Sequence, residues 1–327
     1  MRSSICSSSG LAALASPDRA GGEARVSLSA GRTAIVPGHG RTDSDAGTLQ
    51  VEHRLRTSDG ASLFARAWVP AGVPNAAVCV IHGLGDHSGL YRRLCDALLR
   101  GGYAVSAFDL RGHGRSDGRR GHLRIGDAMG DIDLVLDDTR RRFGPIPCFL
   151  YGHSLGGLLV LHYALRRNPP LAGVVAVGPP FHTALREHRA RMLAARTLGA
   201  VLPSVTLRSG LDATLISRDP NVVAAYRADP LVHSRASLGF ARDMIGAADA
   251  DLADANRFSL PLLLMHGGAD RLNYPSGSRQ FAERVPDNCT IRIYDGLYHE
   301  IHNEPERQQV FADLLSWLAA HAPTLGR

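Results

Sequence analysis

The sequence contains no lysine, and all 37 of its basic residues are arginines. The arginines are scattered among 31 acidic residues, and the formal net charge is only +6. Proteins that bind nucleic acids gather their basic residues into a patch or along one helix face. The mixed distribution therefore argues against a nucleic-acid partner. Arginine without lysine, in a chain rich in alanine and glycine, is typical of codon bias in a GC-rich genome.

Long apolar runs and paired cysteines are also missing. No apolar stretch approaches the roughly 20 residues that a membrane-spanning helix needs. None of the five cysteines stands in the close pairs typical of metal sites. Cys79 and Cys148 fall in predicted core strands, where a free thiol behaves as a small apolar group. These features predict a cytoplasmic protein with reduced cysteines and no metal site.

The first 47 residues contain few large apolar side chains and show no stable periodicity. They lack the continuous apolar core of a signal peptide, and their acidic residues argue against a transit peptide. We interpret residues 1–47 as a disordered N-terminal extension, or as sequence upstream of the true start. The remainder suffices for one large α/β domain with an insertion, or for two smaller domains.

From residue 48 onward, runs that predict strands alternate with amphipathic helical stretches. Residues 51–57 and 62–68 alternate apolar and polar side chains around a turn, which predicts a hairpin. Residues 76–81 form a continuous apolar run, as expected of a parallel strand buried on both faces. The later predicted strands comprise residues 105–108, 148–151, 173–177, 262–265 and 290–294. The alternation predicts a mostly parallel central sheet flanked by helices.

The alternation lapses in residues 179–256, which are helical in pattern but interrupted by prolines and glycine. We interpret this stretch as a helical cap inserted after the sixth strand. It divides the α/β core into a first part, residues 48–178, and a second part, residues 257–327.

Ser154 stands in the pattern Gly-x-Ser-x-Gly, with a predicted strand directly before it and a predicted helix directly after it. That setting is typical of a nucleophile elbow, in which a sharp turn exposes the serine hydroxyl. Ser116 matches the same pattern but lies in a polar loop several residues beyond its strand. Ser154 is therefore the predicted nucleophile.

A serine hydroxyl needs a neighbouring base, which a carboxylate in turn orients. Asp270 and His299 follow two later predicted strands, in the order expected of a hydrolase with a nucleophile elbow. Asp295 competes for the role of the acid but stands too close to His299 to occupy a separate loop. Four other histidines compete for the role of the base, and we expect a structural role for each: His82, His153, His266 and His302.

An oxyanion hole requires two backbone N–H groups. We expect one from Leu155, which follows the nucleophile, and one from Leu84 in the glycine-rich loop after residues 76–81. A plain glycine-rich turn is the alternative interpretation of that loop. The loop lacks the third glycine of the dinucleotide-binding pattern, so we do not expect a nucleotide site there. The histidines near residue 300 lack the His-Glu-x-x-His spacing of a zinc-binding helix.

Taken together, these stretches resemble the monoacylglycerol lipases and lysophospholipases of the α/β-hydrolase superfamily, in the serine aminopeptidase S33-like group. The resemblance extends from about residue 51 to residue 318 and includes His82–Ser88, Asp109–Ser116, Gly152–Gly157, Ser217–Pro220, Ala228–Val232, Gly267–Asp270 and Tyr298–Glu304. It implies an α/β-hydrolase fold, with Ser154, Asp270 and His299 as the triad. It also implies that Leu84 and Leu155 hold the oxyanion, and that residues 179–256 cover an acyl-binding channel.

The resulting functional hypothesis is a serine hydrolase that cleaves monoacylglycerol into fatty acid and glycerol, without a metal or organic cofactor. A lysophospholipase or a broad carboxylesterase is the main alternative, and an acyltransferase or a non-catalytic binding protein is a further one. The apolar and arginine-rich first half of the insertion also suggests transient contact with a membrane surface. An ordinary cap with a solvated arginine face is the competing interpretation, and the oligomeric state stays open.

Overall fold

A computed structural model describes residues 49–187 and 189–322, with the side chains of residues 185, 189–191 and 194 left out. All described residues belong to one compact unit, residues 35–327. The predicted N-terminal extension, residues 1–47, and Cys6 within it lie outside the described residues. No helix in the described residues is long and apolar enough to cross a membrane.

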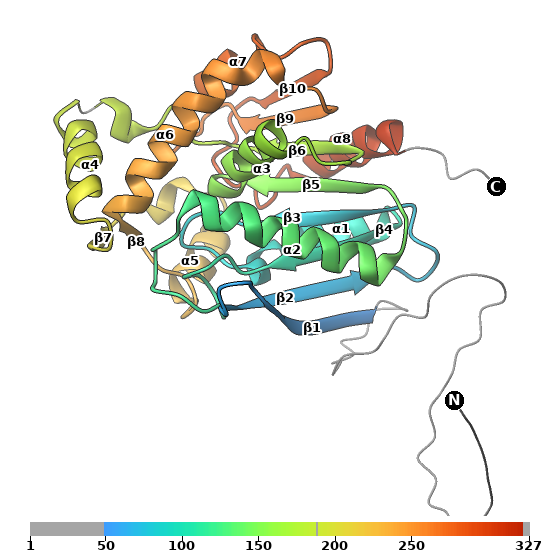
Figure 1. The fold of residues 1–327 in the computed structure, drawn as a ribbon. Coiled ribbons are helices and arrows are strands. Elements are labelled where there is room, and N and C mark those ends of the chain that lie inside the picture. The colour runs from blue at the N-terminus through green and yellow to red at the C-terminus, as the bar shows by residue number, and fades with distance from the viewer. Residues whose placement is uncertain (1–48, 188, 323–327) are drawn as a thin grey trace, which may run out of the picture. The chain divides into compact units, whose positions relative to one another are not determined.

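An eight-stranded sheet forms the centre of the described chain (Figure 1). Its strands run in the spatial order β1-β2-β4-β3-β5-β6-β9-β10. Within this sheet, two neighbouring pairs are antiparallel, β1 with β2 and β2 with β4, and the other neighbouring strands are parallel. The strands are β1 (Leu49–Arg56), β2 (Ser62–Val69), β3 (Ala76–Ile81), β4 (Tyr103–Phe108), β5 (Cys148–His153), β6 (Gly173–Val177), β9 (Leu262–Gly267) and β10 (Cys289–Tyr294).

The inner strands are buried on both faces, which explains their uninterrupted apolar sequence. Every residue of β3, β4, β5 and β9 is buried. Successive side chains of a strand point to opposite faces, and along β3 Cys79 packs into one hydrophobic core while Val78 and Val80 pack into the other. The predicted mostly parallel, helix-flanked sheet is therefore confirmed.

Helices cover both faces of the sheet (Figure 1). One core contains side chains of α2 (Ile125–Phe143), α3 (Leu155–Arg167) and α7 (Pro275–Ala282). The other contains side chains of α1 (Arg92–Arg100) and α8 (Arg307–His321). Four described cysteines, Cys79, Cys95, Cys148 and Cys289, are free thiols, and the first three are buried.

Between β6 and β9 the chain leaves the central sheet. This insertion contains α4 (Arg189–Val201), α5 (Pro220–Ala228) and α6 (Leu238–Asp254). It also contains two short strands, β7 (Thr206–Arg208) and β8 (Arg235–Ser237), which pair in antiparallel fashion. The sequence did not indicate these two strands, because three-residue strands are too short to show a periodic pattern.

The last helix of the insertion is part of the main core. Phe240, Ala248 and Leu252 of α6 are buried in the same hydrophobic cluster as α2 and α3. In Figure 1, α4 lies beyond α6 and farther from the sheet. The first half of the insertion is thus its more exposed half.

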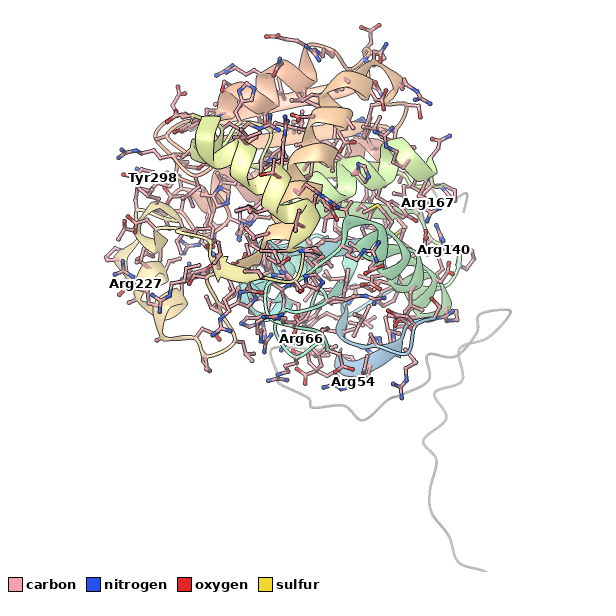
Figure 2. All side chains as sticks on the ribbon, turned by 60° about the vertical axis from the view of Figure 1, so that its left-hand side comes forward. Arg54, Arg66, Arg140, Arg167, Arg227 and Tyr298 are labelled. Carbon is pink, nitrogen blue, oxygen red and sulfur yellow. The ribbon has the colours of Figure 1, made fainter. Side chains whose placement is uncertain are left out.

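The arginines lie on several sides of the described chain (Figure 2). Arg54, Arg140 and Arg167 lie on the α/β core, while Arg227 lies on the insertion. Many arginines pair with nearby carboxylates, as Arg166 does with Asp254. The positive charge is therefore dispersed in space as it is along the sequence.

Candidate active site

Ser154 occupies a strained turn between β5 and α3. Its φ of 55° and ψ of −117° lie in a region that side-chain-bearing residues seldom adopt. The flanking glycines are required by close backbone contacts. A Cβ atom on Gly152 would lie 2.1 Å from the carbonyl oxygen of Gly156, and one on Gly156 would lie 2.2 Å from that of Ile81. Strain of this kind at a serine between a strand and a helix is typical of a nucleophile elbow.

Asp270 and His299 meet beyond the carboxyl ends of β9 and β10. His299 Nδ1 lies 2.7 Å from Asp270 Oδ2. Since an ionised carboxylate only accepts hydrogen bonds, Nδ1 carries the proton. The Nε2 atom of the neutral imidazole is then left as a proton acceptor, which is the tautomer that a general base needs.

The electrostatics of this pair favour the ionised aspartate. Burial alone would raise the pKa of Asp270, but the charge of His299 and the hydrogen bonds from His266 and His299 outweigh it and hold the pKa well below its usual range. The backbone N–H groups of Leu272 and Asn273 also donate to Asp270 Oδ1, at 2.8 and 3.0 Å. Burial would lower the pKa of His299, but Asp270 outweighs burial and raises it above 6.5.

Ser154 and His299 line one small cavity of about 10 Å³. Its lining comprises Leu84, Asp86, His153, Ser154, Leu211, Ile216, Tyr226, His299 and Glu300. Within the described residues, Ser154 Oγ accepts a hydrogen bond from Asn273 Nδ2 at 3.4 Å and makes none to His299. Catalytic hydrogen bonds are often long before substrate binds, so a shared cavity is the expected arrangement of a resting enzyme.

Two backbone N–H groups near the nucleophile have no partner in the described part of the chain. They belong to Leu84, which lines the cavity, and to Leu155, the first residue of α3. A donor at a helix N-terminus favours negative charge nearby. These are the two groups expected to hold an oxyanion.

The competing residues have structural partners. Ser116 Oγ donates to the carbonyl of Asp109 and accepts from the N–H of Phe64, so its one hydrogen is already used. Asp295 is exposed, whereas Asp270 is 3% exposed. The described residues contain no group of three or more side chains arranged to hold a metal ion.

The competing histidines hold backbone or neighbouring side chains in place. His82 Nε2 accepts from the N–H of Leu110, and His153 Nε2 lies 3.2 Å from the carbonyl of His299. His266 Nε2 lies 2.9 Å from the carbonyl of Asn273 and 3.2 Å from Asp270 Oδ2. His302 stacks on Tyr91, and burial, followed by the charge of His299, lowers its pKa to about 3.

Two carboxyl groups in the cavity were not expected from the sequence. Asp86 accepts hydrogen bonds from the hydroxyls of Tyr91 and Tyr226, each at 3.1 Å. Glu300 is 5% exposed, and burial, together with the charge of Asp86, raises its pKa to about 8. Both residues stand within motifs that the sequence singled out, but nothing in those motifs indicated that the two carboxyl groups share a cavity.

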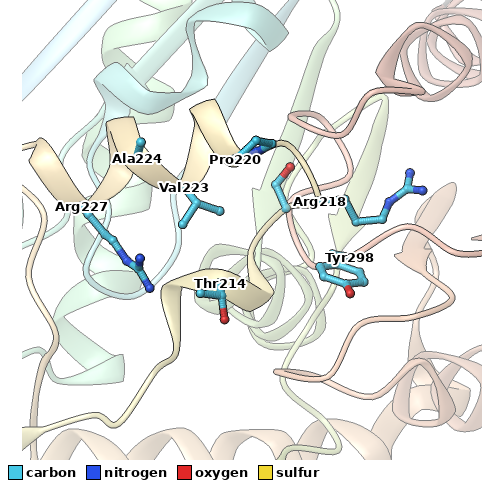
Figure 3. A pocket seen from close by; sticks show the side chains of 8 residues that line it. Thr214, Arg218, Pro220, Val223, Ala224, Arg227 and Tyr298 are labelled. Carbon is cyan, nitrogen blue, oxygen red and sulfur yellow. The ribbon is translucent and has the colours of Figure 1, made fainter.

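A second, larger cavity of about 500 Å³ is lined by residues of the insertion between Thr214 and Arg227, together with Tyr298. Figure 3 shows Arg227 and Tyr298 on opposite sides of it, with Thr214 between them. Ile216 lines the inner cavity, whereas the next residue, Ser217, lines the outer one. The segment around residue 216 is therefore a wall between the reactive groups and the outer cavity.

The comparisons with known proteins agree with this geometry. The family model described as "Serine aminopeptidase, S33" matches residues 72–306, which is more than half of the chain. The chain belongs to this family. Membership establishes the α/β-hydrolase fold that the sequence predicted.

Two curated relatives and one solved structure of the family are similar over most of this chain. A monoacylglycerol lipase of Mycolicibacterium smegmatis is 35% identical over 273 residues, covering 83% of this chain and 97% of the relative. A Dictyostelium discoideum abhydrolase domain-containing protein is 38% identical over 81% of this chain, which spans 28% of that longer protein. The crystal structure of Paleococcus ferrophilus monoacylglycerol lipase has a TM-score of 0.74 and 36% identity, covering 80% of this chain and 99% of that one.

Proposed function

We propose that this protein hydrolyses carboxylic esters of monoacyl lipids, with monoacylglycerol as the substrate class. One observation carries the proposal: Ser154, held in a strained turn, lines the same cavity as His299, which is paired with Asp270. The similarity to monoacylglycerol lipases supports the choice of substrate.

The proposed reaction proceeds through an acyl-enzyme. Ser154 Oγ attacks the ester carbonyl while His299 Nε2 takes the hydroxyl proton. The N–H groups of Leu84 and Leu155 stabilise the oxyanion, and His299 then protonates the departing glycerol oxygen. Water, deprotonated by His299, attacks the acyl-enzyme and releases the fatty acid. Asp270 keeps the histidine tautomer and stabilises the imidazolium.

The acidic wall of the cavity favours an uncharged head group. Asp86 and Glu300 line the space beside Ser154 and His299, and both are buried. The phosphodiester of a lysophospholipid would meet the Asp86 carboxylate there with little screening by water. Glu300 adds no charge at neutral pH, because its pKa is raised to about 8. Glycerol hydroxyls can instead donate hydrogen bonds to these carboxyl groups. The charge distribution therefore supports monoacylglycerol over lysophospholipid.

Replacement of the nucleophile tests the reaction. We expect Ser154→Ala to lose labelling by a fluorophosphonate probe and to lower turnover of a nitrophenyl ester by about 10³-fold or more, as loss of a catalytic serine typically does. Ser116→Ala is the matched control, since it alters the other Gly-x-Ser-x-Gly sequence. Undiminished labelling of the S154A variant would contradict the proposal.

Substrate comparison tests the head-group choice. We expect a higher kcat/KM on monoacylglycerol than on lysophosphatidylcholine of the same acyl chain. A preference for the lysophospholipid would favour the lysophospholipase alternative, whereas equal rates on short-chain esters would favour a general esterase. Acyl transfer to added alcohol in place of water would identify an acyltransferase.

We further propose that the insertion contacts a lipid surface, which would make the protein peripheral at membranes. Much of the exposed large apolar surface falls in one stretch from α4 through β7, comprising Leu193, Leu198, Val201, Leu202, Val205 and Leu207. Apolar groups gathered on one exposed element are typical of interfacial binding.

The arginines in the first half of the insertion contribute less to the proposed lipid contact than the sequence suggested. Arg186 and Arg196 both pair with Asp249 of α6, so much of their charge is neutralised within the fold. Leu185, Arg189 and Arg191 also belong to the apolar and arginine-rich first half of the insertion, but the structure does not describe their side chains. The membrane proposal therefore depends on the apolar side chains.

A further inference from the structure

Asn273 contacts several groups of the candidate site, although no sequence motif indicated a role for it. It follows Asp270 by three residues in the loop after β9, and it is 6% exposed. Its side-chain amide donates to Gly178 O at 2.7 Å and to Ser154 Oγ at 3.4 Å. Its backbone N–H donates to Asp270 Oδ1, and its carbonyl lies 2.9 Å from His266 Nε2. One residue thus contacts both the nucleophile and the acid.

The partners of Asn273 determine which way its amide faces. A carbonyl oxygen can only accept, so the short contact to Gly178 O requires the amide nitrogen at that position. The NH₂ group has two hydrogens, of which one is used by Gly178 and the second points to Ser154 Oγ. Asn273 is therefore a donor to the nucleophile and never an acceptor from it.

We propose that Asn273 is a positioning residue that directs the Ser154 hydroxyl proton toward His299. The inference rests on the proposed role of Ser154 as nucleophile. A hydroxyl has one hydrogen and two lone pairs. With one lone pair occupied by the Asn273 amide, the hydrogen of Ser154 turns away from Asn273, and His299 Nε2 is the vacant acceptor in the same cavity.

The same hydrogen bond acts again when the acyl-enzyme is hydrolysed. The intermediate collapses by breaking the bond between the acyl carbon and Ser154 Oγ, and the imidazolium of His299 returns its proton to that oxygen. Negative charge develops on Oγ as this bond breaks. A donor already aimed at Oγ stabilises that charge without reorganisation.

Three variants separate this role from a merely structural one. Asn273→Leu removes the amide at similar volume, and Asn273→Asp replaces the donor with an acceptor of the same shape. Asn288→Leu is the matched control, because the Asn288 amide likewise donates two hydrogen bonds, here to the carbonyls of Phe258 and Leu260, but touches no residue of the site.

The readouts are the rate of fluorophosphonate labelling, kcat and KM on a nitrophenyl ester, and the thermal midpoint. We expect N273L to lower the labelling rate and kcat by about tenfold or more, the effect of one lost hydrogen bond, with little change in KM. N288L should keep the wild-type rates. N273D should label more slowly than N273L at pH 8. Its carboxylate accepts a hydrogen bond from the Ser154 hydroxyl and so turns that hydrogen away from His299.

Labelling of N273L at the wild-type rate would overturn the inference, as would N273D outpacing N273L. If N273L does not fold, N273A removes the same amide without branched bulk and carries the same expectations. Failure of the probe to label wild-type Ser154 would overturn the proposed function itself. Normal wild-type labelling with unaffected Asn273 variants would overturn this inference alone.

Discussion

At the scale of single residues, the chemistry depends on where protons reside. Asp270 receives four hydrogen bonds, two from histidine rings and two from backbone N–H groups. Stabilisation of the ionised form by so many donors outweighs the cost of burying its charge. The site is therefore preorganised with a charged acid and a correctly oriented base before any substrate enters.

The pH dependence of activity should follow His299. Because Asp270 raises the pKa of His299 above 6.5, the neutral base forms only at higher pH. We expect kcat/KM on a nitrophenyl ester to rise with pH, with a midpoint above 6.5. Asp270→Asn should move that midpoint downward and lower the rate by about 10³- to 10⁴-fold. An acidic limb that does not move in D270N would contradict the coupling of these two groups.

Glu300 should make stability depend on pH. Its pKa is raised from 4.5 to about 8, so the folded protein keeps a proton that the unfolded chain loses between these values. The associated stability is present below pH 4.5 and is lost as the pH rises through 8. We expect Glu300→Gln to flatten the fall in thermal midpoint between pH 5 and pH 8. An equally steep fall in E300Q would show that other groups cause it.

At the scale of elements, the turn from β5 to α3 is the most constrained connection near the site. Gly156, the second residue of α3, lies against the backbone of β3, where an added Cβ would lie 2.2 Å from Ile81 O. Backbone atoms of a central strand cannot move aside as the end of a flexible side chain can. The sharp turn therefore depends on the absence of side chains at Gly152 and Gly156.

Two glycine replacements test this constraint. We expect Gly156→Ala to destabilise the protein by about 1–3 kcal/mol through overpacking, although alanine is the better helix former. Gly130→Ala is the matched control, because Gly130 lies within α2 with nothing within 4 Å of an added Cβ. It should stabilise the protein by up to about 1 kcal/mol. Urea unfolding measures both, and a stabilised G156A would contradict the close packing.

At the scale of the whole molecule, we propose that the insertion controls access to the site. The inner cavity holds about 10 Å³, roughly the space of one water molecule. Leu211, Ile216 and Tyr226 of the insertion form part of its wall. On this proposal, a monoacyl lipid enters when the insertion shifts, and the exposed apolar side chains lie on that same insertion.

Contact with a lipid surface can be measured by co-sedimentation with anionic vesicles at low salt. We expect the wild type to bind vesicles of phosphatidylglycerol and phosphatidylcholine, and the double variant L193S/V201S to bind several-fold less. Val73→Ser is the matched control, because Val73 and Leu193 are each 64% exposed but Val73 lies between β2 and β3. All three proteins should hydrolyse a soluble nitrophenyl ester equally. Absence of wild-type binding would reject the membrane proposal.

Much of the fold follows from local pattern. The run that became β3 and the first four residues of β5 are apolar throughout, as expected of parallel strands buried on both faces. The pairing of β7 with β8 escaped prediction, because its partners are three residues long and about 30 residues apart. The placement of α6 against the main core also escaped prediction, since its sequence resembles that of any amphipathic helix.

The sequence by itself determined the strand–turn–helix around Ser154, the order of Asp270 and His299 behind it, and the alternation that makes a parallel sheet. These are local or sequential properties, which spacing and side-chain type carry directly. Only the tertiary structure brought Asp86, Asn273 and Glu300 to the reactive groups. Their positions depend on loops that meet at one edge of the sheet, and no local pattern specifies which side chains of separate loops will come into contact.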